Sequence, residues 1–139
     1  MTVGGGVLGS SLVLEGGTIP QESALVELRG FARASEEAQT AGDLQPPRAL
    51  RRALADARMN ASDVGYACAF EFGSDSEARA RAALERGLGR FSAATRLEVG
   101  SDPLVRCAMA IKSDASIRAA VALIINPGVG SIALAFGRP

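Results

Sequence analysis

The sequence predicts a single α/β domain over residues 1–139, with a mixed, mostly parallel five-stranded sheet and three helices. Segments of strand length alternate with segments of helical periodicity, and each helical segment begins at a proline or a capping residue. No internal repeat or change of composition divides the chain, and 139 residues is close to the commonest domain size. Strands that alternate with helices favour a mainly parallel sheet.

The first half of the chain predicts two strands, a helix and a third strand. Val7–Glu15 is rich in Val, Leu and Ser, and Ala24–Arg33 alternates apolar with polar residues; both patterns are typical of strands. Pro46–Pro47 then opens a predicted helix at about residues 44–58, since proline is tolerated in a first helical turn. Val64–Phe70 is nearly all apolar, which predicts a strand covered on both faces.

The second half predicts two helices and three strands. Ser74–Glu77 is a capping-box pattern for a helix over about 75–89, and Ser101-Asp102-Pro103 starts another over about 103–113. The remaining strands are predicted at Ala94–Val99, Ile117–Ile125 and Ser131–Gly137. The last two are joined by a glycine-rich turn, so we expect a terminal β-hairpin that adds an antiparallel edge to the sheet.

Composition excludes several functional classes. Lys+Arg and Asp+Glu number 15 each, so the chain has no net charge to attract nucleic acid or an anionic membrane. No apolar run reaches 18 residues, and the N-terminal segment lacks a basic region, so we expect no membrane span and no signal peptide. Two cysteines within apolar segments predict reduced, buried thiols in a cytoplasmic protein. The chain has no histidine, which removes histidine-dependent relays and the commonest metal ligand.

Several segments, in order, resemble the C-terminal half of a β-ketoacyl synthase, a member of the thiolase-like superfamily. "RALRRALADARMNASDVGYACA" is similar to the family's helix, turn and strand, and "SIRAAVALIINPGVGSIALAFGR" is similar to its final hairpin. "GGGVLGSSLVLE" resembles its glycine-rich strand, and "ALVELRGFARASEEA" resembles the strand that follows. The resemblance implies a single thiolase-like half-domain over nearly the whole chain.

The resemblance also implies that the family's catalytic groups are missing. In the family, the strand that matches Gly65–Ala69 runs directly into the first histidine, where this chain has Phe70-Glu71. The second histidine falls near Asp102-Pro103, at the start of the last helix. The nucleophilic cysteine belongs to the N-terminal half of the family, which this chain lacks. Because the family reaction needs a thiolate and two imidazoles, the resemblance predicts that condensation by this chain alone is implausible.

Three remaining residues have a functional interpretation beside a structural one. Cys107, near a helix N-terminus, is a weak nucleophile candidate, but we favour a buried apolar role for it and for Cys68. Glu71, between two phenylalanines, is either an acid with a raised pKa or, as we favour, a solvated loop charge. Asp75 and Glu77 are explained by the helix dipole, so we expect neither a metal nor another cofactor.

The resemblance implies a partner, because the family packs two similar halves with helices between two sheets. A lone half would expose an apolar helix and sheet face. We therefore expect a homodimer, or a heterodimer with a ketosynthase-like subunit, through Leu104, Ala108 and Ile111 of the last helix. The leading hypothesis is a catalytically inactive half-subunit, like a chain-length factor, in polyketide or fatty-acid synthesis. The alternatives are a repurposed enzyme that uses Cys107 or Glu71 on an acyl thioester, and a module that binds a small molecule or acyl carrier protein.

Overall fold

The computed structural model describes residues 2–4, 11–13, 26–35, 48–73, 77–89, 94–126 and 129–138. Its strands are β1 (Thr2–Gly4), β2 (Ser11–Val13), β3 (Glu27–Ala34), β4 (Tyr66–Glu71), β5 (Arg96–Val99), β6 (Ala119–Asn126) and β7 (Gly130–Gly137). Its helices are α1 (Arg48–Asp56), α2 (Glu77–Leu88) and α3 (Pro103–Ser113), with a short 3-10 helix, η2 (Ala61–Asp63), before β4. No helix in these ranges is long and apolar enough to cross a membrane.

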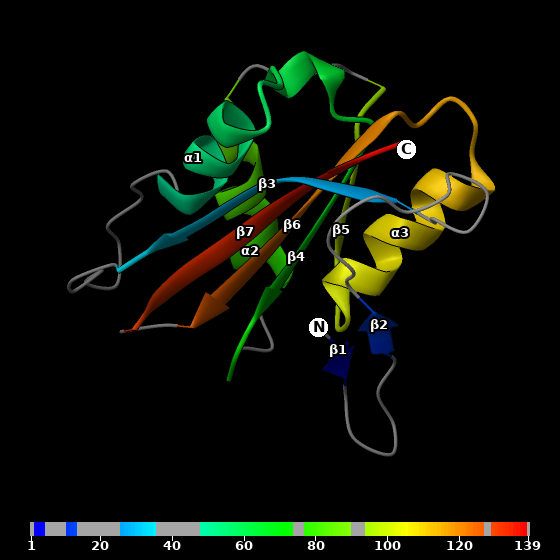
Figure 1. Cartoon of the computed structure of the whole chain (residues 1–139). Coiled ribbons are helices and arrows are strands. Elements are labelled where there is room, and N and C mark those ends of the chain that lie inside the picture. Colours follow the sequence, from blue (N-terminus) through cyan, green and yellow to red (C-terminus); the bar gives the residue numbers. More distant parts are fainter. Residues whose placement is uncertain are drawn as a thin grey trace.

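The main sheet has five strands in the order β3-β7-β6-β4-β5 (Figure 1). β4 is parallel to β5 and β6, while β7 is antiparallel to both β6 and β3. Four strands therefore run in one direction and only β7 runs against them. This confirms the predicted mixed, mostly parallel sheet with three helices.

The predicted position of the terminal hairpin is wrong. β7 does not form an antiparallel edge; it lies between β6 and β3, and β3 forms that edge of the sheet. The reason is visible in β7 itself, where four successive apolar residues, Ala133 to Phe136, are all buried. A strand with apolar residues on both faces is typical of a sheet interior, not of an edge.

The predicted N-terminal strand at Val7–Glu15 is found only in part. Ser11–Val13 is strand β2, but it pairs antiparallel with β1 in a separate two-stranded sheet and not with the main one. The rest of that predicted strand lies outside the described residues. The predicted helix starts at Pro46–Pro47 and Ser74 also lie outside them, although α1 and α2 are present at Arg48 and Glu77.

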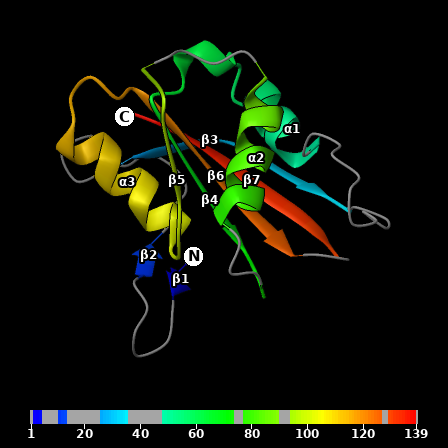
Figure 2. The same ribbon diagram turned by 180° about the vertical axis from the view of Figure 1, so that it is seen from behind.

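The helices cover the two faces of the main sheet unequally. α1 and α2 lie on one face and α3 lies on the other, as the two opposite views show (Figures 1 and 2). Along β4, Ala67 and Ala69 pack in the core under α1 and α2, while Tyr66 and Cys68 pack in the core under α3. The alternation of side chains along each strand thus builds two cores from one sheet.

Two close contacts hold α1 against the sheet and against α2. Gly30 of β3 lies so near α1 that a Cβ atom there would overlap the carbonyl oxygen of Ala53 and come within 2.9 Å of Cβ of Ala57. Gly87 of α2 faces the side chain of Leu50, which is fully buried. Both positions need glycine because the neighbouring atoms occupy the space that a side chain would fill.

The predicted interface residues of α3 are buried within their own chain, which corrects their assignment. Leu104, Ala108 and Ile111 are at most 8% exposed and pack with β4, β6 and β7. The opposite side of α3 carries Met109, which is 50% exposed, and half-buried Val105. Helical periodicity locates the apolar stripe of a helix, but it does not show whether that stripe packs on the chain's own sheet or on a partner. Here the stripe packs on the chain's own sheet.

Candidate functional site

The predicted site positions Phe70-Glu71 and Asp102-Pro103 lie at the end of β4 and after the end of β5, side by side at one end of the sheet. β4 and β5 are parallel, so the segments that follow Glu71 and Val99 leave the sheet at the same end, the carboxyl end of both strands. The amide of Gly100 donates a hydrogen bond of 3.0 Å to the carbonyl oxygen of Ala69, which joins the two segments. The structure therefore brings the Phe70-Glu71 segment next to the loop that contains Asp102.

Phe70 and Phe72 form the apolar part of the surface at the carboxyl end of β4. Their rings are 5.0 Å apart and nearly perpendicular, at 79°, which is the favourable edge-to-face arrangement. Phe70 is half-buried on the α3 face of the sheet, and Phe72 is 52% exposed just beyond the strand. Neither ring can accept or donate a proton, so this pair supplies surface and shape but no acid–base group.

Glu71 is not the solvated loop charge that we favoured from the sequence. It is the last residue of β4, and its side chain is only 3% exposed. Its carboxylate lies 3.3 Å from Nε of Arg79 on α2, while neither oxygen has a hydrogen-bond partner. Side chains alternate along a strand, so Glu71 lies on the α1–α2 face, opposite Phe70. The favoured interpretation failed because the strand continues one residue beyond the apolar run.

Asp102 and Pro103 begin α3 in an unusual way. Asp102 has left-handed backbone angles, φ 56° and ψ 51°, and its side chain makes no capping hydrogen bond. Pro103 follows in the first turn of the helix and is buried. The predicted helix start is confirmed by position, but the expected side-chain cap is not formed in this conformation.

Both cysteines are buried in the core between α3 and the sheet. Cys107 is fully buried, and its thiol donates a hydrogen bond of 3.2 Å to the carbonyl oxygen of Val121. Burial raises the pKa of Cys107 well above its ordinary value and also raises the pKa of Cys68. A nucleophilic thiolate needs a lowered pKa and access to substrate, and neither cysteine has them.

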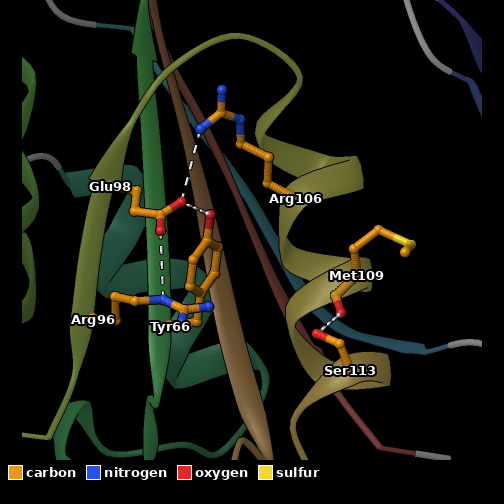
Figure 3. A network of polar contacts seen from close by, with 6 residues as sticks. All are labelled: Tyr66, Arg96, Glu98, Arg106, Met109 and Ser113. Carbon is orange, nitrogen blue, oxygen red and sulfur yellow. Dashed lines mark hydrogen bonds and ion pairs between the residues drawn. The ribbon is translucent and has the colours of Figure 1, made fainter.

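Sequence reasoning missed a polar network on the β5 side of α3 (Figure 3). The hydroxyl of Tyr66 donates a hydrogen bond of 2.6 Å to Glu98, whose carboxylate also lies 3.4 Å from Arg96 and 3.7 Å from Arg106. The guanidinium of Arg96 stands 5.0 Å from the centre of the Tyr66 ring. The alternating charges of "RLEV" could have revealed that Arg96 and Glu98 share one face, but not that the face has a tyrosine beneath it.

The chemistry available at this site is limited. Burial, followed by the hydrogen bond to Glu98, raises the pKa of Tyr66, so its hydroxyl remains protonated and acts as a donor. No group of three or more potential metal ligands occurs within the described ranges. Glu71 lies on the α1–α2 face of β4, whereas Tyr66 and Cys107 lie between β4 and α3. The three groups therefore do not converge on one exposed point.

Comparison with known proteins gives a structural likeness but no likeness in sequence. No protein-family model and no curated protein matches the chain. A variant of OleA from Xanthomonas campestris matches with a TM-score of 0.66 and 13% identity, over 91% of this chain and 58% of that one. A priming β-ketosynthase from a polyketide pathway matches with a TM-score of 0.64 and 13% identity, over 82% and 50%.

A third solved structure agrees with these two. It is the 3-oxoacyl-(acyl carrier protein) synthase III, FabH, of Xanthomonas oryzae pv. oryzae, with a TM-score of 0.62 and 13% identity over 81% of this chain and 56% of that one. The chain therefore has the thiolase-like fold over most of its length. It spans 50% to 58% of the length of these three structures.

Proposed function

We propose that this chain, with the fold of ketosynthases, is a catalytically inactive ketosynthase-like half-subunit, comparable to a chain-length factor. It assembles with itself or with an active ketosynthase during polyketide or fatty-acid synthesis in the cytoplasm. The observation that carries this proposal is the identity of the residues at the carboxyl ends of β4 and β5. There the resemblance places two histidines, whereas this chain has Phe70-Glu71, with Glu71 buried on the far face, and Asp102-Pro103.

The lack of a nucleophile and of oxyanion donors where β4 and β5 end supports the proposal that the chain is catalytically inactive. A decarboxylating condensation needs a nucleophile for the acyl group and donors that stabilise an oxyanion. The chain contains no histidine, and both of its cysteines are buried with raised pKa values. The aromatic pair at this edge adds apolar surface in place of proton donors.

An apolar surface beside α3 supports the proposal that the chain assembles with a partner. Four residues of neighbouring strands on this face of the sheet define what we term the open α3 face: Phe31, Phe70, Ile124 and Ile132. Phe31 is 51% exposed and the other three are half-buried. A contiguous apolar patch on one side of a sheet is typical of a protein–protein contact.

The first prediction is that the protein does not become acylated. Incubation of the folded protein with a simple acyl thioester should leave its intact mass unchanged, because both thiols are fully buried and protonated. Alkylation with N-ethylmaleimide in denaturant, where both thiols should react, is the positive control. A stable acyl adduct that maps to Cys107, and that disappears in Cys107→Ser, would favour the repurposed enzyme instead.

The second prediction concerns the open α3 face. Phe31→Glu should weaken self-assembly, or assembly with a ketosynthase from the same genome, by about tenfold or more, since an interface buries Phe31 against apolar surface. Analytical ultracentrifugation measures this. Ala55→Glu, at an exposed position of α1 on the opposite face, is the matched control and should have no effect. Assembly that Phe31→Glu leaves unchanged would refute this use of the face.

A further inference from the structure

The outer side of β3 is an edge of the main sheet. β3 pairs with β7 on one side, and no described strand lies on its other side (Figure 1). The strand is eight residues long, and its Leu28 and Phe31 are 39% and 51% exposed. A long edge strand with exposed apolar side chains can add a strand from another chain, which leads to aggregation. The outer edge of β3 is therefore a point where the folded domain is open to self-association.

A side chain of α1 binds a main-chain donor at this edge. The amide of Phe31 donates a hydrogen bond of 3.1 Å to Oδ2 of Asp56, the last residue of α1, and so points away from β7. An added strand would need the same amide, because neighbouring strands join through the main-chain groups that point toward each other. The carboxylate of Asp56 therefore occupies the place that a carbonyl oxygen of an added strand would take.

The packing of α1 on β3 holds Asp56 at the edge. A Cβ atom on Gly30 would overlap the main-chain carbonyl oxygen of Ala53, so α1 lies directly against the strand nearly one turn before Asp56. The amide of Ala57 still donates to that carbonyl oxygen, at 3.0 Å, so the helix keeps its last turn beside β3. Main-chain contacts thus fix the position of Asp56, and only the rotamer of its short side chain has to be ordered.

The position of Asp56 is not explained by the helix itself. Asp56 lies in the last turn of α1, where the negative end of the helix dipole disfavours an acidic side chain. Within the described ranges no arginine or lysine forms an ion pair with it. Its hydrogen bond is with the strand edge, which indicates that its role concerns β3.

We propose that Asp56 is an autoinhibitory contact that prevents β3 from adding a strand of another chain. It binds the outward amide of Phe31, and its negative charge repels the carbonyl oxygens that an incoming strand would bring to the same place. This inference does not depend on the proposed function. The side chain of Phe31 belongs to the open α3 face, whereas its main-chain amide belongs to the edge, so either contact can fail without the other.

Asp56→Ala removes the contact and provides the main test. At equal concentration this variant should develop thioflavin T fluorescence several times faster than the unmodified protein, because the freed amide of Phe31 can donate to a strand of a second copy. Hydrogen exchange followed by nuclear magnetic resonance should show the Phe31 amide exchanging several times faster in the same variant. Asp56→Asn keeps a side-chain oxygen that can accept the hydrogen bond, so it should aggregate more slowly than Asp56→Ala and keep the amide protected.

Asp63→Ala is the matched control. Asp63 also accepts a hydrogen bond from a main-chain amide, that of Asn60 at 2.9 Å, but it lies in η2 and not at a strand edge. Aggregation of Asp56→Ala alone, with a faster-exchanging Phe31 amide, supports the proposal. Equal aggregation of the two alanine variants, or a Phe31 amide whose exchange is unchanged in Asp56→Ala, would overturn it. Loss of the folded circular dichroism spectrum in Asp56→Ala would assign Asp56 a structural role and would overturn it as well.

Discussion

Replacing Ala108 by glutamate should unfold the domain and not merely dissociate an assembly. Ala108 is 2% exposed on the side of α3 that packs on the sheet, in a core with Leu134 and Phe136. Glutamate there would place a charge and four extra heavy atoms beyond the methyl into a filled apolar layer. Overpacking and an unpaired buried charge together should lower the free energy of unfolding by about 3 kcal/mol or more.

Chemical denaturation followed by circular dichroism measures this loss. Met109→Glu is the matched control, since the neighbouring residue is 50% exposed and the same new charge stays in water. The control should unfold within about 0.5 kcal/mol of the unmodified protein, as surface substitutions usually do. If Ala108→Glu dissociates an assembly while keeping its unfolding midpoint, then Ala108 faces a partner, as the sequence alone suggested.

Replacing Gly30 by alanine should be nearly as damaging, although it adds one methyl group. That methyl would overlap the carbonyl oxygen of Ala53 and press on Ala57, so α1 and β3 must separate. Both obstacles include main-chain atoms, which cannot rotate away. We expect a loss of about 2–3 kcal/mol from overpacking, and with it the hydrogen bond from the amide of Phe31 to Asp56.

Gly65→Ala is the comparison for this prediction. Its added methyl would lie 3.3 Å from Cγ1 of Ile117, a flexible side-chain atom that can move by a few tenths of an ångström. We expect this control to cost less than about 1 kcal/mol. Equal stability of the two variants, measured by thermal unfolding, would mean that α1 does not approach β3 as closely as described.

The sequence predicted the elements well because local signals determine them. The predicted helix at 103–113 coincides with α3, since proline sets its first turn. The order of strands was less predictable: nothing local in Glu27–Ala34 shows that it pairs with β7. That pairing places β7 inside the sheet, and only the buried run Ala133 to Phe136 hinted at it.

The candidate site was predictable in position but not in character. Phe70 and Glu71 do lie at the carboxyl end of β4, beside the loop that contains Asp102. Burial of Glu71 depends on α2 packing above it and on the one-residue alternation of the strand, so sequence alone did not reveal it. The contacts among Tyr66, Glu98 and Arg106 join three separate elements, and no short-range pattern reports such a meeting.

The pairing of β3 with β7 has a consequence for how quickly the domain forms. Glu27 pairs with Gly137 and Ala34 with Ser131, so this ladder joins segments about a hundred residues apart in the chain. Closing so long a loop costs entropy before the contacts can form, and folding slows as contacts become more distant in sequence. During synthesis β3 leaves the ribosome long before its neighbour exists. Until then Phe31 and Leu28 remain on an unpaired strand, where their apolar side chains are open to aggregation or to capture by a chaperone.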